Sequence, residues 1–156
     1  MEYLKPIYSD VRKWLVGLLP DASKDVVRAY QNGIAMPENA IIMTFMLEKR
    51  LDQLSATGTG KFFDSIQGTM QLDFYGVKAH ERARKICTLW QTLYTTENMM
   101  SCQPLYCSDP KDLTFINETG QYELRFMAML ELQYNNEYDV DVDTFTTIPK
   151  TELNNV

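Results

Sequence analysis

Two long segments in which apolar and polar residues alternate constrain the fold of this chain more than any other feature. They span residues 41–52 and 62–74, and a period of two is that of a β-strand with one face buried and one face in water. The apolar positions are Ile41, Met43, Phe45, Leu47 and Leu51 in the first segment and Phe62, Ile66, Met70, Leu72 and Phe74 in the second. The stretch between them, SATGTGK at residues 55–61, is typical of a hairpin loop. We therefore predict a hairpin whose strands exceed the usual length of about 5 or 6 residues and reach beyond the core.

A third long strand is predicted near the end of the chain. Apolar and polar residues also alternate along residues 121–134. One whole face of the sheet is therefore predicted to be polar and exposed to water. The apolar members are Tyr122, Leu124, Phe126, Ala128, Leu130, Leu132 and Tyr134. A short strand is expected at residues 25–30 and a loop at residues 31–39.

Two other segments have helical periodicity. Residues 4–19 and 77–94 carry apolar side chains three and four positions apart, which predicts two amphipathic helices. Residues 97–120 are expected to be irregular, with short extended pieces. The fold class is therefore α+β, a mainly antiparallel sheet with a protruding hairpin and both helices packed on one face. That face is predicted to consist of Phe45, Leu47, Ile66, Met70, Leu72, Leu124, Phe126 and Leu130.

Composition narrows the class of protein. The chain has 156 residues, which predicts one core, and 21 acidic against 15 basic residues give a net charge of −6. An acidic chain without a basic stripe is a poor match for a protein that grips nucleic-acid phosphates. No apolar run is long enough to span a bilayer, no secretory signal is recognisable, and an odd number of cysteines suits a reducing compartment. We expect a cytosolic protein.

Three motifs invite a chemical interpretation, and each lacks a residue that its mechanism needs. Residues 57–61 resemble a phosphate loop but have Phe62 where Ser or Thr is required. Asp139, Asp141 and Asp143 match the spacing of the first carboxylate ligands in a calcium-binding loop. However, Lys150 occupies the position of the final glutamate ligand. A zinc site could be drawn from Cys102, Cys107, Cys87 and His80. However, the pair Cys102 and Cys107 has no second spaced pair, and Cys87 belongs to the apolar stripe of a predicted helix. We predict buried cysteines, a surface His80, and no catalytic, cofactor-binding or metal-binding residue.

The segment at residues 104–135 resembles the neck or tail terminator family of tailed bacteriophages. Members of the family carry an ordered series of short motifs, found here as Leu105-Tyr106, Asp109-Pro110, Phe115-Ile116-Asn117, Gln121-Tyr122-Glu123 and Leu132-Gln133-Tyr134-Asn135. Gln31-Asn32, Pro37 and residues 71–76 are similar to the same family, so the likeness covers residues 4–135. The pair Arg125-Phe126 departs from a more usual Arg-Trp, and the acidic tail does not align with the family's motifs.

The resemblance implies a tail-completion protein that forms a ring, expected to be a hexamer, on the end of the tail tube nearest the capsid. Its partners would be its own copies, the tail tube protein, a head-completion or connector protein, and a sheath protein if the tail is contractile. DNA would only pass through the channel, and no membrane would be involved. The protein would assemble in the host cytoplasm and end in the virion neck.

The chain is expected to divide into a terminator-like domain, residues 1–135, and an acidic extension, residues 136–156, which carries a net charge of −4. Asn135-Asn136 is expected to separate the extension from the last strand, so that it docks on another chain; the alternative is an edge strand folded back on the same subunit. Subunit or partner contacts are predicted at Ser55, Thr57, Gly58, Thr59, Gly60, Lys61, Val140, Val142, Phe145 and Ile148. The alternative function is a small oligomeric ligand-binding or regulatory module that uses the polar sheet face.

Overall fold

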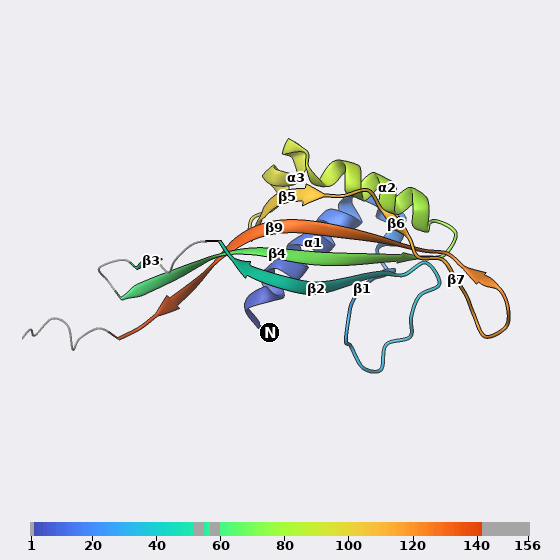
Figure 1. The fold of residues 1–156 in the computed structure, drawn as a ribbon, viewed down its shortest axis with the longest axis horizontal. Coiled ribbons are helices and arrows are strands. Elements are labelled where there is room, and N and C mark those ends of the chain that lie inside the picture. The colour runs from blue at the N-terminus through green and yellow to red at the C-terminus, as the bar shows by residue number, and fades with distance from the viewer. Residues whose placement is uncertain (1, 52–54, 57–59, 142–156) are drawn as a thin grey trace, which may run out of the picture.

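The computed structural model describes residues 2–51, 55–56 and 60–141 of the chain (Figure 1). Its helices are α1 (Lys5–Leu18), α2 (Ala79–Trp90) and α3 (Leu93–Asn98), with short 3-10 turns η1 (Glu2–Leu4) and η2 (Pro20–Ala22). Its strands are β1 (Val26–Arg28), β2 (Ile41–Arg50), β3 (Ser55–Ala56), β4 (Lys61–Tyr75), β5 (Gln103–Cys107), β6 (Lys111–Asp112), β7 (Phe115–Ile116), β8 (Tyr122–Glu123) and β9 (Arg125–Asp139).

The main sheet has the strand order β1-β2-β4-β9-β5, with β3 paired to β4 and β6 paired to β9. Among the strand pairs of the described residues, only β1–β2 is parallel, and β7 and β8 form a separate hairpin. Strands β4 and β9 pair along their whole 15-residue length, from Lys61 opposite Asp139 to Tyr75 opposite Arg125. This ladder is the axis of the elongated molecule in Figure 1.

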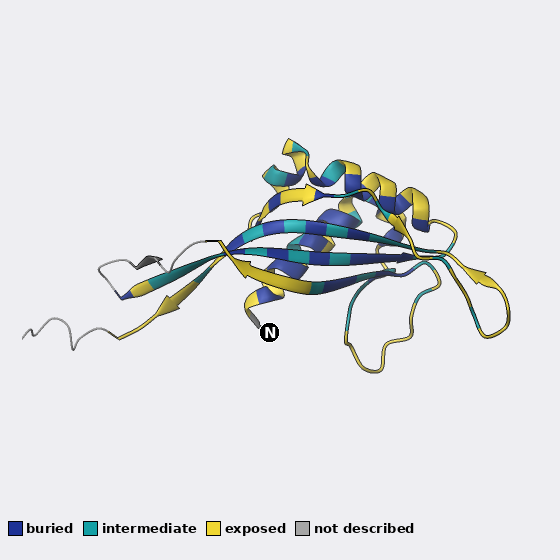
Figure 2. Cartoon of the chain, in the orientation of Figure 1, coloured by how far each residue is buried: buried dark blue, intermediate teal, exposed yellow. Residues whose placement is uncertain are grey.

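Both long helices cover the same face of the sheet; in Figure 1, α1 passes behind the strands and α2 lies along the β5 edge. Trp14 of α1 meets Trp90 of α2 edge to face, with ring centroids 5.2 Å apart. Each indole N–H has a partner, since Trp14 donates to Thr95 Oγ1 and Trp90 to the carbonyl of Glu131. The predicted α+β class, with a mainly antiparallel sheet and the long helices on one face, is confirmed. Figure 2 shows buried residues following the middle of the sheet and the inner sides of the helices.

One strand departs from its predicted alternation because it contains a bulge. The pairing of β2 with β4 shifts between Phe45 and Leu47, so that Leu47 lies opposite Thr69 on the outer face. Leu47 is 65% exposed and Leu51 is also exposed, which corrects their predicted place on the apolar face. The same shift moves Glu48 to the core side, opposite Gly68.

Other corrections concern segment ends. The second helix stops at Trp90, and Thr92 caps a separate α3, which leaves Leu93 and Tyr94 exposed. Tyr122 and Leu124 precede β9 and are also exposed, so they are not part of the predicted apolar face.

The expectation that Asn135-Asn136 ends the last strand is wrong. β9 continues to Asp139, and Asn135 and Asn136 pair with Ser65 and Asp64 of β4. Backbone pairing with a neighbouring strand thus outweighs the weak strand preference of asparagine.

The sequence pattern predicts both Leu47 and Leu130 on the apolar face, but the register shift places only Leu130 there. We expect Leu130→Ala, at a fully buried position in β9, to lower the free energy of unfolding by about 2 to 5 kcal/mol through the lost packing. Leu47→Ala, at an exposed position, should change it by less than about 0.5 kcal/mol. Urea unfolding of both variants measures the difference, and equal losses would contradict the observed register.

Candidate assembly surfaces

The end of the central ladder projects beyond both helices as an arm, defined here as residues 55–56, 60–65 and 135–140 (Figure 1). Within the arm, β3 pairs with the start of β4, and the end of β9 pairs with the other edge of β4. The backbone N–H of Val140 donates to the carbonyl of Gly60, and Lys61 forms an ion pair with Glu137 at 3.0 Å. The arm is therefore held together by its own backbone pairing rather than by a core.

Four of the ten predicted contact residues lie in this arm. Ser55 belongs to β3, Gly60 has a positive φ of 80° at the turn into β4, and Lys61 begins β4. Two apolar residues near the end of the arm are about half exposed, Val140 at 53% and Tyr138 at 49%. Thr57, Gly58, Thr59, Val142, Phe145 and Ile148 lie outside the described residues.

The outer face of the sheet carries polar side chains that bind one another. Asp73, which is buried, accepts hydrogen bonds from Arg125 Nη2 at 2.8 Å and from Gln71 Nε2 at 2.7 Å. Farther along the strands, Gln67 donates to Glu131, and Gln133 donates to Ser65 and Asn135. The predicted polar face thus exists, but its hydrogen-bonding groups are largely used within the sheet. A ligand bound there would have to displace these contacts.

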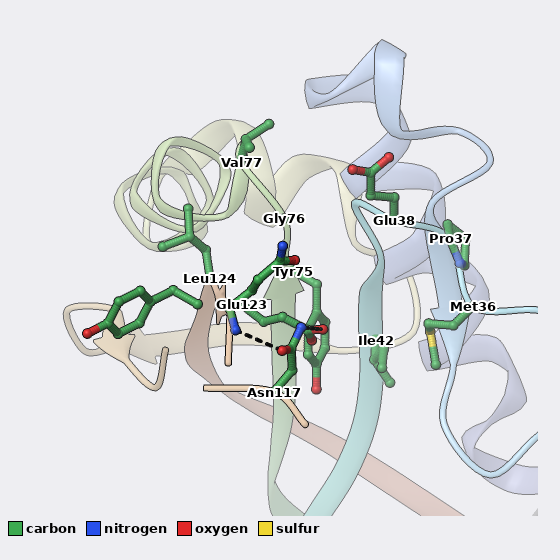
Figure 3. Close-up of a pocket in the computed structure, with 12 residues that line it drawn as sticks. Met36, Pro37, Glu38, Ile42, Tyr75, Gly76, Val77, Asn117, Glu123 and Leu124 are labelled. Atoms are coloured by element: carbon green, nitrogen blue, oxygen red, sulfur yellow. Dashed lines mark hydrogen bonds between the residues drawn. The ribbon is translucent and has the colours of Figure 1, made fainter. Parts of the chain in front are cut away.

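A cavity of about 570 Å³ lies at the opposite end of β4 from the arm. Figure 3 shows it between Met36 and Pro37 on one side and the β7–β8 hairpin on the other, with Ile42 and Tyr75 of the sheet in between. The lining contains the acidic residues Glu38 and Glu123 and no basic residue. Asn117 Nδ2 donates to Glu123 Oε1 at 3.1 Å and fixes this side of the cavity. An apolar or basic segment of a partner would suit such a lining.

At the base of the arm, two tyrosines contact Glu48, the residue that the bulge in β2 places on the core side. Tyr3 and Tyr134 both donate their hydroxyl protons to Glu48 Oε1. Tyr134 is 4% exposed, and burial, followed by the hydrogen bond to Glu48, raises the pKa of its phenol above the usual range. This cluster joins η1, β2 and β9 where the arm begins.

The cysteines and His80, which the sequence offers as possible metal ligands or nucleophiles, lie outside the tyrosine cluster. Cys87, Cys102 and Cys107 are buried, as predicted, and burial raises the pKa of the Cys102 thiol to about 12. His80 lies on the exposed side of α2 and stacks on Phe126 with ring centroids 4.7 Å apart. In the described part of the chain, no three His, Cys, Asp or Glu side chains gather in a way that could hold a metal ion. Among those same residues, no helix has the length and hydropathy of a membrane span.

The tyrosine cluster predicts a loss of stability in alkali. Because the folded state holds Tyr134 neutral, its contribution is present below the usual tyrosine pKa of about 10 and is lost as the pH rises above it. The free energy of unfolding, measured with urea near pH 8 and near pH 10.5, should therefore fall less in Tyr134→Phe than in the unmodified protein. Tyr30→Phe, at a position 91% exposed, serves as the control and should leave the fall unchanged. An identical fall in all three proteins would contradict this assignment.

Comparison with known proteins places these features in a family. The model of the family described as phage neck terminator protein matches residues 5–156. No curated protein matches the chain. The family match spans nearly the whole sequence, including the arm and the acidic extension. The chain therefore belongs to the phage neck terminator protein family and is a structural protein of the bacteriophage neck.

Proposed function

We propose that this protein assembles into a hexameric ring that caps the head-proximal end of the tail tube and stops tube polymerisation. The ring joins the tail to the head-completion or connector protein, contacts the sheath if the tail is contractile, and lets DNA pass through its channel. It assembles in the host cytoplasm and does not act as an enzyme. The family supports a neck protein of this kind, and the physical argument for a ring follows from the arm.

The arm is the observation that carries this proposal. It extends a backbone ladder past the two helices and carries the exposed apolar residues Tyr138 and Val140. Strands that project without a cover are prone to pair with other chains unless a defined neighbour satisfies them. In a closed ring every subunit offers the same surface to the next one, so each arm is covered and none remains to continue aggregation.

The two ends of the molecule are also unlike, which suits a head-to-tail contact. The arm lies at one end of β4, and the cavity lined by Glu38 and Glu123 lies at the other. A ring built from head-to-tail contacts needs two different surfaces on each subunit, whereas a two-fold dimer needs one surface that contacts itself. In this proposal residues 55–61 contact neighbouring subunits or the tube. The first residues of the acidic extension belong to the arm, and the remainder, residues 141–156, docks on another chain.

Removing the exposed apolar side chains of the arm should separate assembly from folding. We expect Tyr138→Ala/Val140→Ala to keep the unfolding midpoint of the monomer and to lose ring formation, because both side chains are about half exposed in the single chain. Native mass spectrometry, with and without tail tube protein, reports the oligomer, and electron microscopy reports tube length. Tubes should grow without a length limit in the presence of the variant.

The matched control is Leu93→Ala/Met100→Ala, which removes two exposed apolar side chains near α3, at 72% and 89% exposure. This variant should still form rings and cap tubes. Normal capping by the arm variant would contradict the role of the arm, and monomers of the unmodified protein that leave tubes uncapped would contradict the ring itself.

A further inference from the structure

A second surface, separate from the cavity of Figure 3, is a basic cleft between α1 and the strand β1. The cleft, with a volume of about 510 Å³, is lined by four basic residues and by no acidic residue. The basic residues are Lys5, Arg12, Lys24 and Arg28. Its apolar lining includes Val27, Ile34 and Met43. The cleft therefore gathers four positive charges in a protein whose net charge is −6.

No carboxylate in the part of the chain that the structure describes neutralises the positive charge of the cleft. Across residues 2–51, 55–56 and 60–141, none of the four basic residues forms an ion pair with a carboxylate. Arg12 donates to the carbonyl of Ser23, and Arg28 lies over the ring of Tyr8 at 4.1 Å. These contacts fix the two guanidinium groups and leave their charge uncompensated.

The acidic residues of neighbouring segments are occupied elsewhere. Asp21 and Asp25, on either side of Lys24, form ion pairs with Arg82 of α2 at 3.4 and 3.0 Å. Asp10 of α1 accepts a hydrogen bond from the backbone N–H of Ser101. An anionic group from outside the subunit would therefore find the cleft ready to receive it.

The cleft also borders an open strand edge. β1 pairs with β2 in parallel, and Ile41 N–H donates to the carbonyl of Asp25 while Ala29 N–H donates to the carbonyl of Met43. By the alternation of a parallel ladder, the backbone groups of Val26 and Arg28 point away from β2, toward the outside of the sheet. An extended segment can add to such an edge through main-chain hydrogen bonds while its side chains enter the cleft.

The occupant that fits this cleft is the acidic end of the same chain. From Asp139 onward the chain carries four acidic residues against Lys150, and Asp139, Asp141 and Asp143 alternate with Val140 and Val142. Alternating carboxylates and valines match a cleft with basic and apolar lining along an open strand edge. We propose that the acidic extension of one subunit, from residue 141 to residue 148, docks in the basic cleft of the neighbouring subunit, an inference that rests on the ring proposed above.

The position of the arm favours a neighbour over the chain's own cleft. β1 pairs with residues 41–43 of β2, and these residues pair in turn with β4. Among their partners in β4, Leu72 is the one nearest to the arm. Leu72 lies 11 residues from Lys61, which pairs with Asp139 at the far end of the arm, and this separation corresponds to about 36 Å along the strand. β9 runs away from the body as far as Val140, so its own extension would have to reverse and pass back along the whole ladder. A head-to-tail ring brings the next subunit's cleft to the arm without this reversal.

Disulfide trapping with full-length chains tests the proposal. A tagged chain carrying Asp143→Cys is mixed with an untagged chain carrying Lys24→Cys, and the mixture is mildly oxidised; the three native cysteines are buried. A mixed dimer of tagged and untagged chains is expected. The same tagged chain mixed with Lys111→Cys, an exposed position on β6, should give none. A single chain carrying both Asp143→Cys and Lys24→Cys reports a contact with its own cleft as a cross-linked monomer.

Charge reversal supplies a second measurement. Here the cysteines are placed at Thr144→Cys of the extension and at Gln31→Cys in the lining of the cleft, so that the charged positions stay available. Lys5→Glu/Lys24→Glu should then lower the yield of this mixed dimer about tenfold, and Asp141→Lys/Asp143→Lys in the partner chain should restore it. Lys13→Glu/Lys111→Glu, which makes the same change in net charge outside the cleft, should leave the yield unchanged. The yield should also fall as salt is raised, because the contact is between charges.

The outcomes separate this proposal from the ring itself. If the protein caps tubes but no mixed dimer forms, the docking proposal is overturned and the ring stands; if the mixed dimer forms but tubes remain uncapped, the function as a terminator fails instead. A cross-linked monomer in place of the mixed dimer would assign the cleft to the chain's own extension. Binding of labelled duplex DNA that is lost in Lys5→Glu/Lys24→Glu would assign the cleft to nucleic acid, and either result would overturn the proposal.

Discussion

The backbone ladder between β4 and β9 is the interaction on which the rest of the molecule depends. Its 15 residue pairs extend over about 50 Å, whereas α1, with 14 residues, covers about 21 Å. The helices can therefore bury the sheet only along part of its length, beside residues such as Leu72 and Leu130. The remaining length has backbone pairing but no core, and it becomes the arm. A protein that needed only to fold would not require this excess of strand, which is why the arm directs attention to assembly.

The transition from body to arm depends on the close packing of the Phe45 ring against Gly68 of the neighbouring strand. Gly68 of β4 lies against the ring of Phe45, and a Cβ added at Gly68 would come within 2.3 Å of the ring atom Cζ. The ring occupies the space of a missing side chain, and the register of β2 shifts immediately after Phe45. This shift turns Glu48 toward Tyr134 and Tyr3, so that a polar cluster closes the apolar core at its open end. The core thus ends on hydrogen bonds rather than on an exposed apolar edge.

A buried arginine organises the end of the sheet opposite the arm. Arg82 is only 4% exposed and holds Asp25, Asp21 and the carbonyl of Asn39, which ties α2 to both ends of the segment that contains β1. Burying a guanidinium is costly unless carboxylates and carbonyls surround it, so this network fixes β1 and the residues that precede β2. It also draws the two aspartates away from the basic cleft. The uncompensated charge of Lys24 and Arg28 is therefore a consequence of how α2 is attached.

The sequence by itself determined the elements whose side chains repeat regularly. The apolar stripes of α1 and α2 and the alternation of β4 and β9 predicted two helices on one face of a long-stranded sheet, and ordered motifs such as Gln121-Tyr122-Glu123 indicated the family. These signals are local, because burial on one face imposes a period on each segment independently. Only the tertiary structure decided where the strands shift and end. The bulge after Phe45 depends on Gly68 of another strand, β9 continues through Asn135 because β4 is there to pair with it, and the basic cleft assembles residues from α1 and β1 whose aspartate neighbours are bound by Arg82. Such features arise from contacts between segments distant in the chain, and no local period records them.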